Sequence, residues 1–134
     1  MDFLTFTADE EVKISLMDEQ HEQMTHVINN IYTAFILKKK RTVQSQLKVL
    51  LAQLRKHFDY EEGLMKQTKF EGYYSHKLEH DRFFRKVESI FSSYVAKKPI
   101  LTLEGLEDVK NWFYNHIEIK DKICGGHFAR NGIR

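Results

Sequence analysis

Histidine and carboxylate side chains occur at helical spacing inside otherwise apolar stripes of this sequence. The 134 residues include 7 His, and two pairs of potential donors, His57 with Glu61 and His76 with His80, are each four residues apart. On a helix such a pair is separated by about 40° around the axis and one turn along it, so both side chains can point at one place. Because unpaired carboxylates and imidazoles are costly to bury, they need a common partner, and a metal ion is the simplest one.

Two further helical segments carry His21 and His116 on their apolar stripes, where they could complete a coordination shell. Asp121 follows His116 by five residues, about 140° around an ideal helix. If Asp121 is a ligand, the helix must be widened locally, for example by a π-type bulge. Seven donors exceed the roughly six that one ion accepts, so we expect two ions bridged by the two carboxylates; this donor set suits iron, zinc or copper. The predicted metal ligands are His21, His57, Glu61, His76, His80, His116 and Asp121.

The remaining candidates for chemistry are weaker. His26 lies off the stripe of its helix and is expected at the surface or in the outer shell of the site, while His127 is expected to be solvent-exposed in a tail. Residues 76–80 read H-x-x-E-H, the inverted zinc-protease signature. Glu79 lies about 100° around a helix from His80, however, so we interpret this match as accidental. Cys124 is expected to be an inert thiol.

Apolar periodicity defines the elements that would position these side chains. Helices are predicted over about residues 18–37, 42–65, 73–96 and 103–122, with an extended arm over 1–15 and a tail over 125–134. Four amphipathic helices joined by short connections must bury their stripes against one another. The sequence therefore predicts an all-α, up-down-up-down antiparallel four-helix bundle, formed by a single domain over residues 1–134.

Composition limits the class of protein. Hydrophobic residues make up 42% of the chain and charged residues 30%, as in ordinary globular domains. The formal net charge of +2 is too balanced to indicate nucleic-acid binding, and no apolar run approaches the roughly 18 residues that span a bilayer. A single cysteine excludes an internal disulfide and no signal-peptide pattern is visible, so we expect a cytoplasmic protein without membrane partners.

Four segments together resemble the hemerythrin family in its single-domain bacterial form. They are DEQH ending at His21, HFDYEE over 57–62, H-x-x-x-H over 76–80 and WFYNHIEIKD over 112–121. The resemblance covers roughly residues 4–124. It implies a non-haem di-iron centre with a bridging oxo or hydroxo group.

The resemblance also implies a role for each ligand. One iron would be bound by three histidines, namely His76, His80 and His116. The second iron would be bound by His21 and His57 and would keep an open position for dioxygen. Glu61 and Asp121 would bridge the two ions.

Apolar side chains are expected to wall the gas pocket and keep it dry. The candidates are Leu54, Phe58, Phe113 and Ile117. Phe113 stands where the family commonly has Leu, and a bulkier ring could narrow access to the pocket. Phe6 and Lys13 stand near positions where the family often has Trp and Gly.

Three functional hypotheses follow. The first is reversible dioxygen binding for storage, delivery or sensing by a monomer that is not an enzyme. The alternative is a di-iron enzyme acting on nitric oxide, peroxide or oxygen, since the same open position could take other small gases. The third is an interaction module with a structural metal, in which the cationic segment 38–41 contacts a partner, although a solvated helix end is the simpler interpretation of that segment.

Overall fold

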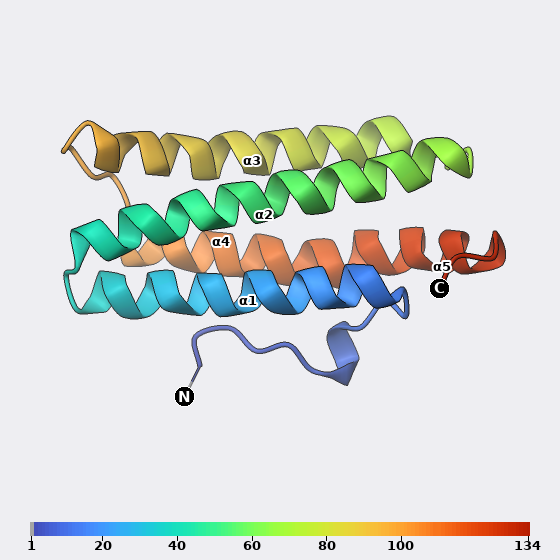
Figure 1. Cartoon of the computed structure of the whole chain (residues 1–134), viewed down its shortest axis with the longest axis horizontal. Helices are drawn as coiled ribbons and strands as arrows, with labels where there is room; N and C mark the ends of the chain where they lie inside the picture. Colours follow the sequence, from blue (N-terminus) through green and yellow to red (C-terminus); the bar gives the residue numbers. More distant parts are fainter. Residues whose placement is uncertain (1) are drawn as a thin grey trace.

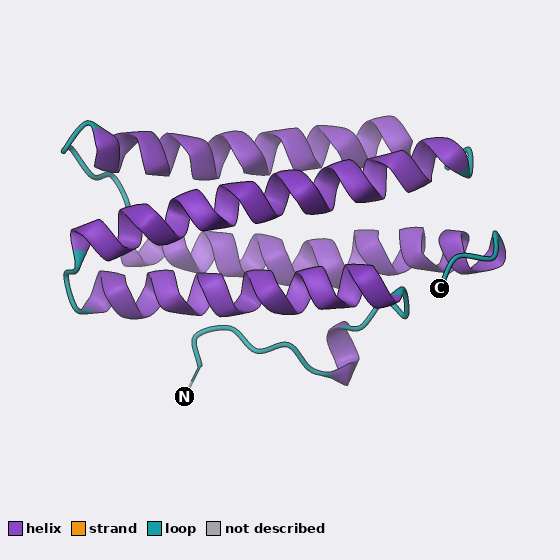
Figure 2. Ribbon diagram, viewed as in Figure 1, coloured by secondary structure: helices purple, strands orange, loops and turns teal. Residues whose placement is uncertain are grey.

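Four long helices pack side by side in alternating directions in a computed structural model that describes residues 2–134 (Figure 1). Every regular element in this range is helical (Figure 2), which confirms the predicted all-α four-helix bundle. The principal helices are α1 (Ser15–Ile36), α2 (Lys40–Gln67), α3 (Tyr73–Val95) and α4 (Leu103–Asn115). None of the described helices is both long and apolar enough to cross a membrane.

The fourth helical rod is longer than the sequence pattern predicts. After α4 it continues through a π-helical segment, η2 (His116–Asp121), into α5 (Lys122–Arg130). The prediction of a tail from residue 125 was therefore wrong for all but the last four residues. Phe128 is fully buried in the hydrophobic core, and this packing keeps the chain helical through the two consecutive glycines.

The extended arm contains a short 3-10 turn, η1 (Ala8–Glu10), and runs along the outside of α1 (Figure 1). The side chain of Asn29 accepts a hydrogen bond from the backbone N–H of Leu4 and donates one to its carbonyl, both at 2.8 Å. The Tyr114 hydroxyl in α4 donates to the Thr5 carbonyl at 2.9 Å. The arm is thus fixed to two helices, and it brings the ring of Phe6 to 6.3 Å from the ring of His21.

Gly125 provides the room for the arm to reach α5. A Cβ added there would lie 2.9 Å from the carbonyl oxygen of Val12 and 3.2 Å from its Cβ, whereas one added at Gly126 would meet only the end of the Arg130 side chain, at 3.4 Å. We expect Gly125→Ala to destabilise the fold by about 1–3 kcal/mol. Gly126→Ala, the matched control, should stabilise it by about 0.5–1 kcal/mol. Urea unfolding of both variants measures the difference, and equal stabilities would contradict the packing argument.

Three helices end in a Schellman motif with lysine in the left-handed conformation. Lys38, Lys69 and Lys97 have φ of 56°, 54° and 59°, and in each case the next N–H donates back to a carbonyl of the last helical turn at 2.8–2.9 Å. Glycine normally occupies this position because a Cβ is strained there. Lys13, before α1, has the same strained conformation, with φ of 65°.

We expect glycine at Lys69 or Lys97 to stabilise the fold because it removes this strain. The gain should be about 0.5–1 kcal/mol for each substitution, after the extra backbone entropy of glycine in the unfolded chain is subtracted. Thermal unfolding of Lys69→Gly and Lys97→Gly measures the effect. Alanine at the same positions keeps the strained Cβ and is the control, so an equal gain with alanine would contradict the explanation.

Candidate metal centre

All seven predicted ligands converge inside the bundle. The four helical rods each contribute, with His21 from α1, His57 and Glu61 from α2, His76 and His80 from α3, and His116 and Asp121 from the ends of η2. Every one of these side chains is buried. Their ligand atoms form two adjoining groups that could each hold a metal ion, and Asp121 belongs to both.

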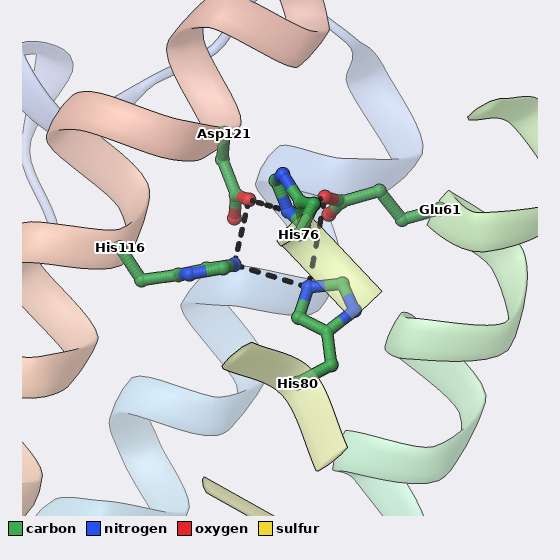
Figure 3. Close-up of side chains that lie close together, drawn as sticks. All are labelled: Glu61, His76, His80, His116 and Asp121. Atoms are coloured by element: carbon green, nitrogen blue, oxygen red, sulfur yellow. Dashed lines mark hydrogen bonds and ion pairs between the residues drawn. The ribbon is translucent and has the colours of Figure 1, made fainter. Parts of the chain in front are cut away.

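The larger group contains three histidines and two carboxylates, which point toward one another in Figure 3. Asp121 Oδ1 lies 2.9 Å from the Nε2 atom of His116 and 3.1 Å from that of His76. Glu61 Oε1 contacts His76 Nε2 and lies 3.7 Å from His80 Nε2. Three imidazole nitrogens and two carboxylate oxygens therefore face a common centre.

The smaller group uses the other oxygen of each carboxylate. Asp121 Oδ2 lies 2.9 Å from His21 Nε2 and 3.8 Å from His57 Nε2, and Glu61 Oε2 lies 3.2 Å from His57 Nε2. Each carboxylate thus presents one oxygen to each histidine group. This is the arrangement that two bridging carboxylates require.

The π-helical segment explains how Asp121 reaches this position. His116 begins the segment and Asp121 ends it, so the wider turn brings two residues five apart onto the same face. The widening that the sequence requires for an Asp121 ligand is confirmed by the structure.

The chemistry of this donor set fits a pair of cations. The Nε2 atoms of His21 and His57 lie 3.2 Å apart, and those of His80 and His116 lie 3.0 Å apart. The lone pairs of two imidazole nitrogens at such distances repel each other unless a proton lies between them or a cation binds both. Neither oxygen of Glu61 accepts a hydrogen bond of ordinary geometry, although the side chain is fully buried. Metal ions would satisfy all of these atoms at once.

Outer contacts hold the imidazoles in orientation. The Nδ1–H of His57 donates to Gln20 Oε1 at 2.7 Å, and that of His80 donates to Glu62 Oε2 at 2.9 Å. These hydrogen bonds leave Nε2 of each ring free to face the centre. Gln20 and Glu62 were not predicted to have a role. Their positions next to His21 and Glu61 in the chain are the only signal that could have indicated one.

The histidines outside the two groups lie where they cannot join them. His26 is exposed, as predicted. His127 is half-buried in α5 with Nε2 3.0 Å from the Thr68 carbonyl, so the prediction of a solvent-exposed tail histidine was wrong. Glu79 does not face His76 and His80 as a protease signature would require, because its Oε2 lies 3.6 Å from the outward Nδ1 of His116.

The buried carboxylates raise the proton affinity of neighbouring imidazoles, so protons compete with metal ions for these ligands. Burial lowers the pKa of His57 and His76, but the adjoining carboxylates of Asp121 and Glu61 raise it overall, to about 9 and about 10. Burial and Asp121 raise the pKa of Glu61, but His57 and His76 bring it down to about 2. Before metal binds, protonated His57 and His76 therefore face the two carboxylates at neutral pH, and Asp121 also raises the pKa of His116 in spite of its burial.

Metal uptake should consequently release protons. Binding of two divalent ions at pH 7 is expected to displace at least about two protons, from His57 and His76. Because both pKa values are raised, apparent affinity should increase with pH up to about 9, by as much as about tenfold per unit for each proton. Titration of chelator-treated protein in dilute buffers of different ionisation enthalpy counts the protons. Uptake without proton release would contradict this charge balance.

A small apolar cavity adjoins the His21 and His57 group. Its volume is about 10 Å³, at the lower limit of the space that one water molecule needs. Its lining includes all four residues proposed from the sequence for a gas pocket, namely Leu54, Phe58, Phe113 and Ile117. Met24 and Trp112 also line it and were not proposed for this role.

Aromatic rings form the side of the cavity near the three-histidine group. Phe58 stacks on His80 with ring centroids 3.8 Å apart, and Trp112 stacks on His116 at 4.4 Å. Phe83 stacks on the other face of Trp112 at 3.8 Å. The packed rings exclude water from this side and restrict movement of the two imidazoles.

An antiparallel four-helix bundle with an internal cluster of histidines and carboxylates defines a class of helical metal-binding proteins. The sequence profile of the "Hemerythrin HHE cation binding domain" matches residues 12–125. The chain belongs to the hemerythrin family, as the resemblance in its sequence indicates.

Individual relatives agree with this assignment. A bacteriohemerythrin of Methylococcus capsulatus is 25% identical over 126 residues, which span 93% of this chain and 96% of that protein. A myohemerythrin of Sipunculus nudus is 30% identical over 115 residues, which span 84% and 85%. The crystal structure of a wild-type hemerythrin shares the fold, with a TM-score of 0.88 at 23% identity over 95% of this chain and 98% of that one.

Proposed function

We propose that this protein binds dioxygen reversibly at a non-haem di-iron centre. The observation that carries the proposal is the sharing of Glu61 and Asp121 between two histidine groups beside a small apolar cavity. His76, His80 and His116 would hold one iron, His21 and His57 would hold the other, and the two carboxylates would bridge them. When bound, the iron pair supplies the electrons that make dioxygen binding possible and reversible.

The unequal donor count supports a binding role for one side of the centre. The larger group offers five protein donors, whereas the smaller offers two imidazoles and one oxygen from each carboxylate. Fewer donors leave room for an exogenous ligand at the His21 and His57 group, and both of these histidines line the cavity, together with His116 and Asp121. The apolar walls would exclude water and disfavour the escape of charged, reduced oxygen species.

The surroundings of the cavity favour binding over catalytic turnover. Apart from the proposed ligands, its described lining is Met24, Trp112 and the four apolar residues Leu54, Phe58, Phe113 and Ile117. This lining offers no separate carboxylate, lysine or hydroxyl group to act as a general acid or base. An enzyme acting on nitric oxide or peroxide would need protons from elsewhere, so it is the less supported function.

An anaerobic titration tests the proposal. Chelator-treated protein is loaded with ferrous iron without oxygen, its iron is counted, and its visible spectrum is recorded before and after exposure to air. About two irons per chain, uptake of about one dioxygen per iron pair and loss of the new absorption under vacuum are expected. A colourless protein that retains zinc, or steady consumption of nitric oxide with a reductant, would contradict reversible oxygen binding.

We also propose that the protein acts as a single-domain monomer in the cytoplasm. Its only cysteine, Cys124, is fully buried, and burial raises the pKa of its thiol. A buried neutral thiol is unreactive and gives no support for disulfide chemistry. Fractionation of cells and sedimentation of the purified protein test the two parts of this proposal separately.

A further inference from the structure

A groove of about 510 Å³ opens at the end of the bundle opposite the metal centre. It lies where α1 turns into α2 and where α3 connects to α4, on the left in Figure 1. Its floor is apolar and includes Phe35, Ile36, Val43, Pro99 and Leu101. A volume of several hundred Å³ with apolar walls is typical of sites for small ligands.

The rim of this groove is cationic. Lys38, Lys39 and Lys40 line it, and Arg41 follows them in the chain. Lys97 and Lys98 lie nearby, just after the end of α3. Within the described residues, none of these six side chains takes part in an ion pair. The cations at this end of the bundle are therefore available to an anion from outside the chain.

Two kinds of hydrogen-bond donor also face this region. Tyr94 lines the groove and is 6% exposed. Burial raises the pKa of Tyr94, so it remains a neutral donor. The first turn of α2 begins at Lys40 without a side-chain cap, so the backbone N–H groups ahead of Val43, which donates to the Lys39 carbonyl, have no capping partner.

We propose that the groove binds a single-chain anionic amphiphile, specifically a fatty acid. The acyl chain would lie on the apolar floor, and the carboxylate would meet Lys38, Lys39 and Lys40 at the start of α2. A concave groove suits one acyl chain. Ile36, Leu37, Val95 and Ile100 are exposed at the same end of the bundle, so a bilayer surface is the competing occupant that the vesicle experiment below tests. A second copy of this chain would bring its own lysines against these and be repelled. The proposal does not depend on the metal centre.

Calorimetric titration of the full-length protein with monomeric dodecanoate, at low ionic strength, tests the proposal. We expect one saturable site and binding at least about tenfold tighter than that of dodecyltrimethylammonium, which has the same chain and the opposite charge. Amide resonances of residues 34–43 and 94–101 should shift on binding, while those around the metal centre should not.

Matched charge reversals locate the site. The triple substitution Lys38→Glu, Lys39→Glu and Lys40→Glu should weaken dodecanoate binding at least about tenfold. The control replaces three exposed lysines elsewhere on α2, by Lys48→Glu, Lys56→Glu and Lys66→Glu, with the same change in net charge, and should retain tight binding. The proposal is overturned by equal binding of both amphiphiles, by equal losses in both triple variants, by a ligand-resistant dimer, or by binding of anionic vesicles without binding of monomeric dodecanoate.

Discussion

Asp121→Asn should abolish binding of both metal ions, although it changes one atom of the side chain. The carboxylate presents Oδ1 to His76 and His116 and Oδ2 to His21, so its charge is shared by both groups. An amide keeps the shape but removes that charge and leaves at most one oxygen to coordinate. We expect affinity for each ion to fall by more than about 100-fold, beyond the usual effect of losing an outer contact.

Metal analysis after dialysis against a weak chelator measures this loss. Asp108→Asn, at an exposed carboxylate on α4, is the control and should retain two ions per chain. Circular dichroism of the metal-free variant checks that the bundle is still folded. If Asp121→Asn keeps both ions with its helical content intact, the bridging role of this carboxylate is wrong.

His57→Ala should remove one ion and leave the other. His57 contributes only to the smaller group, where His21 is the one other imidazole, whereas the larger group retains all three of its histidines. The variant should therefore hold about one ion per chain, and any reversible absorption change with dioxygen should disappear. Metal analysis together with the anaerobic spectrum provides both measurements.

Added imidazole gives this substitution a direct control. The alanine leaves an imidazole-sized space next to Gln20 Oε1, which accepts a hydrogen bond from His57 at 2.7 Å, and free imidazole should enter it and restore the second ion. His26→Ala, which removes an exposed histidine from α1, should have no effect on metal content. Retention of two ions by His57→Ala without imidazole would refute the proposed division of ligands.

The sequence by itself determined the helical bundle and the set of candidate ligands that lie inside it. An apolar stripe has only one low-energy orientation, toward the other stripes, so any histidine at the same spacing is carried inward with it. The five-residue step from His116 to Asp121 even predicted the local widening of the fourth rod, since no regular α-helix places both residues on one face.

Only the tertiary structure decided how the ligands are shared and what surrounds them. Periodicity fixes the direction of a side chain around its own helix, but the level at which it meets another helix depends on packing along the whole bundle. The division of the Glu61 and Asp121 oxygens, and the contact of Glu62 with His80, follow from that relative height. The same reason explains α5, because Gly125 and Phe128 are helical through contacts that local sequence does not encode.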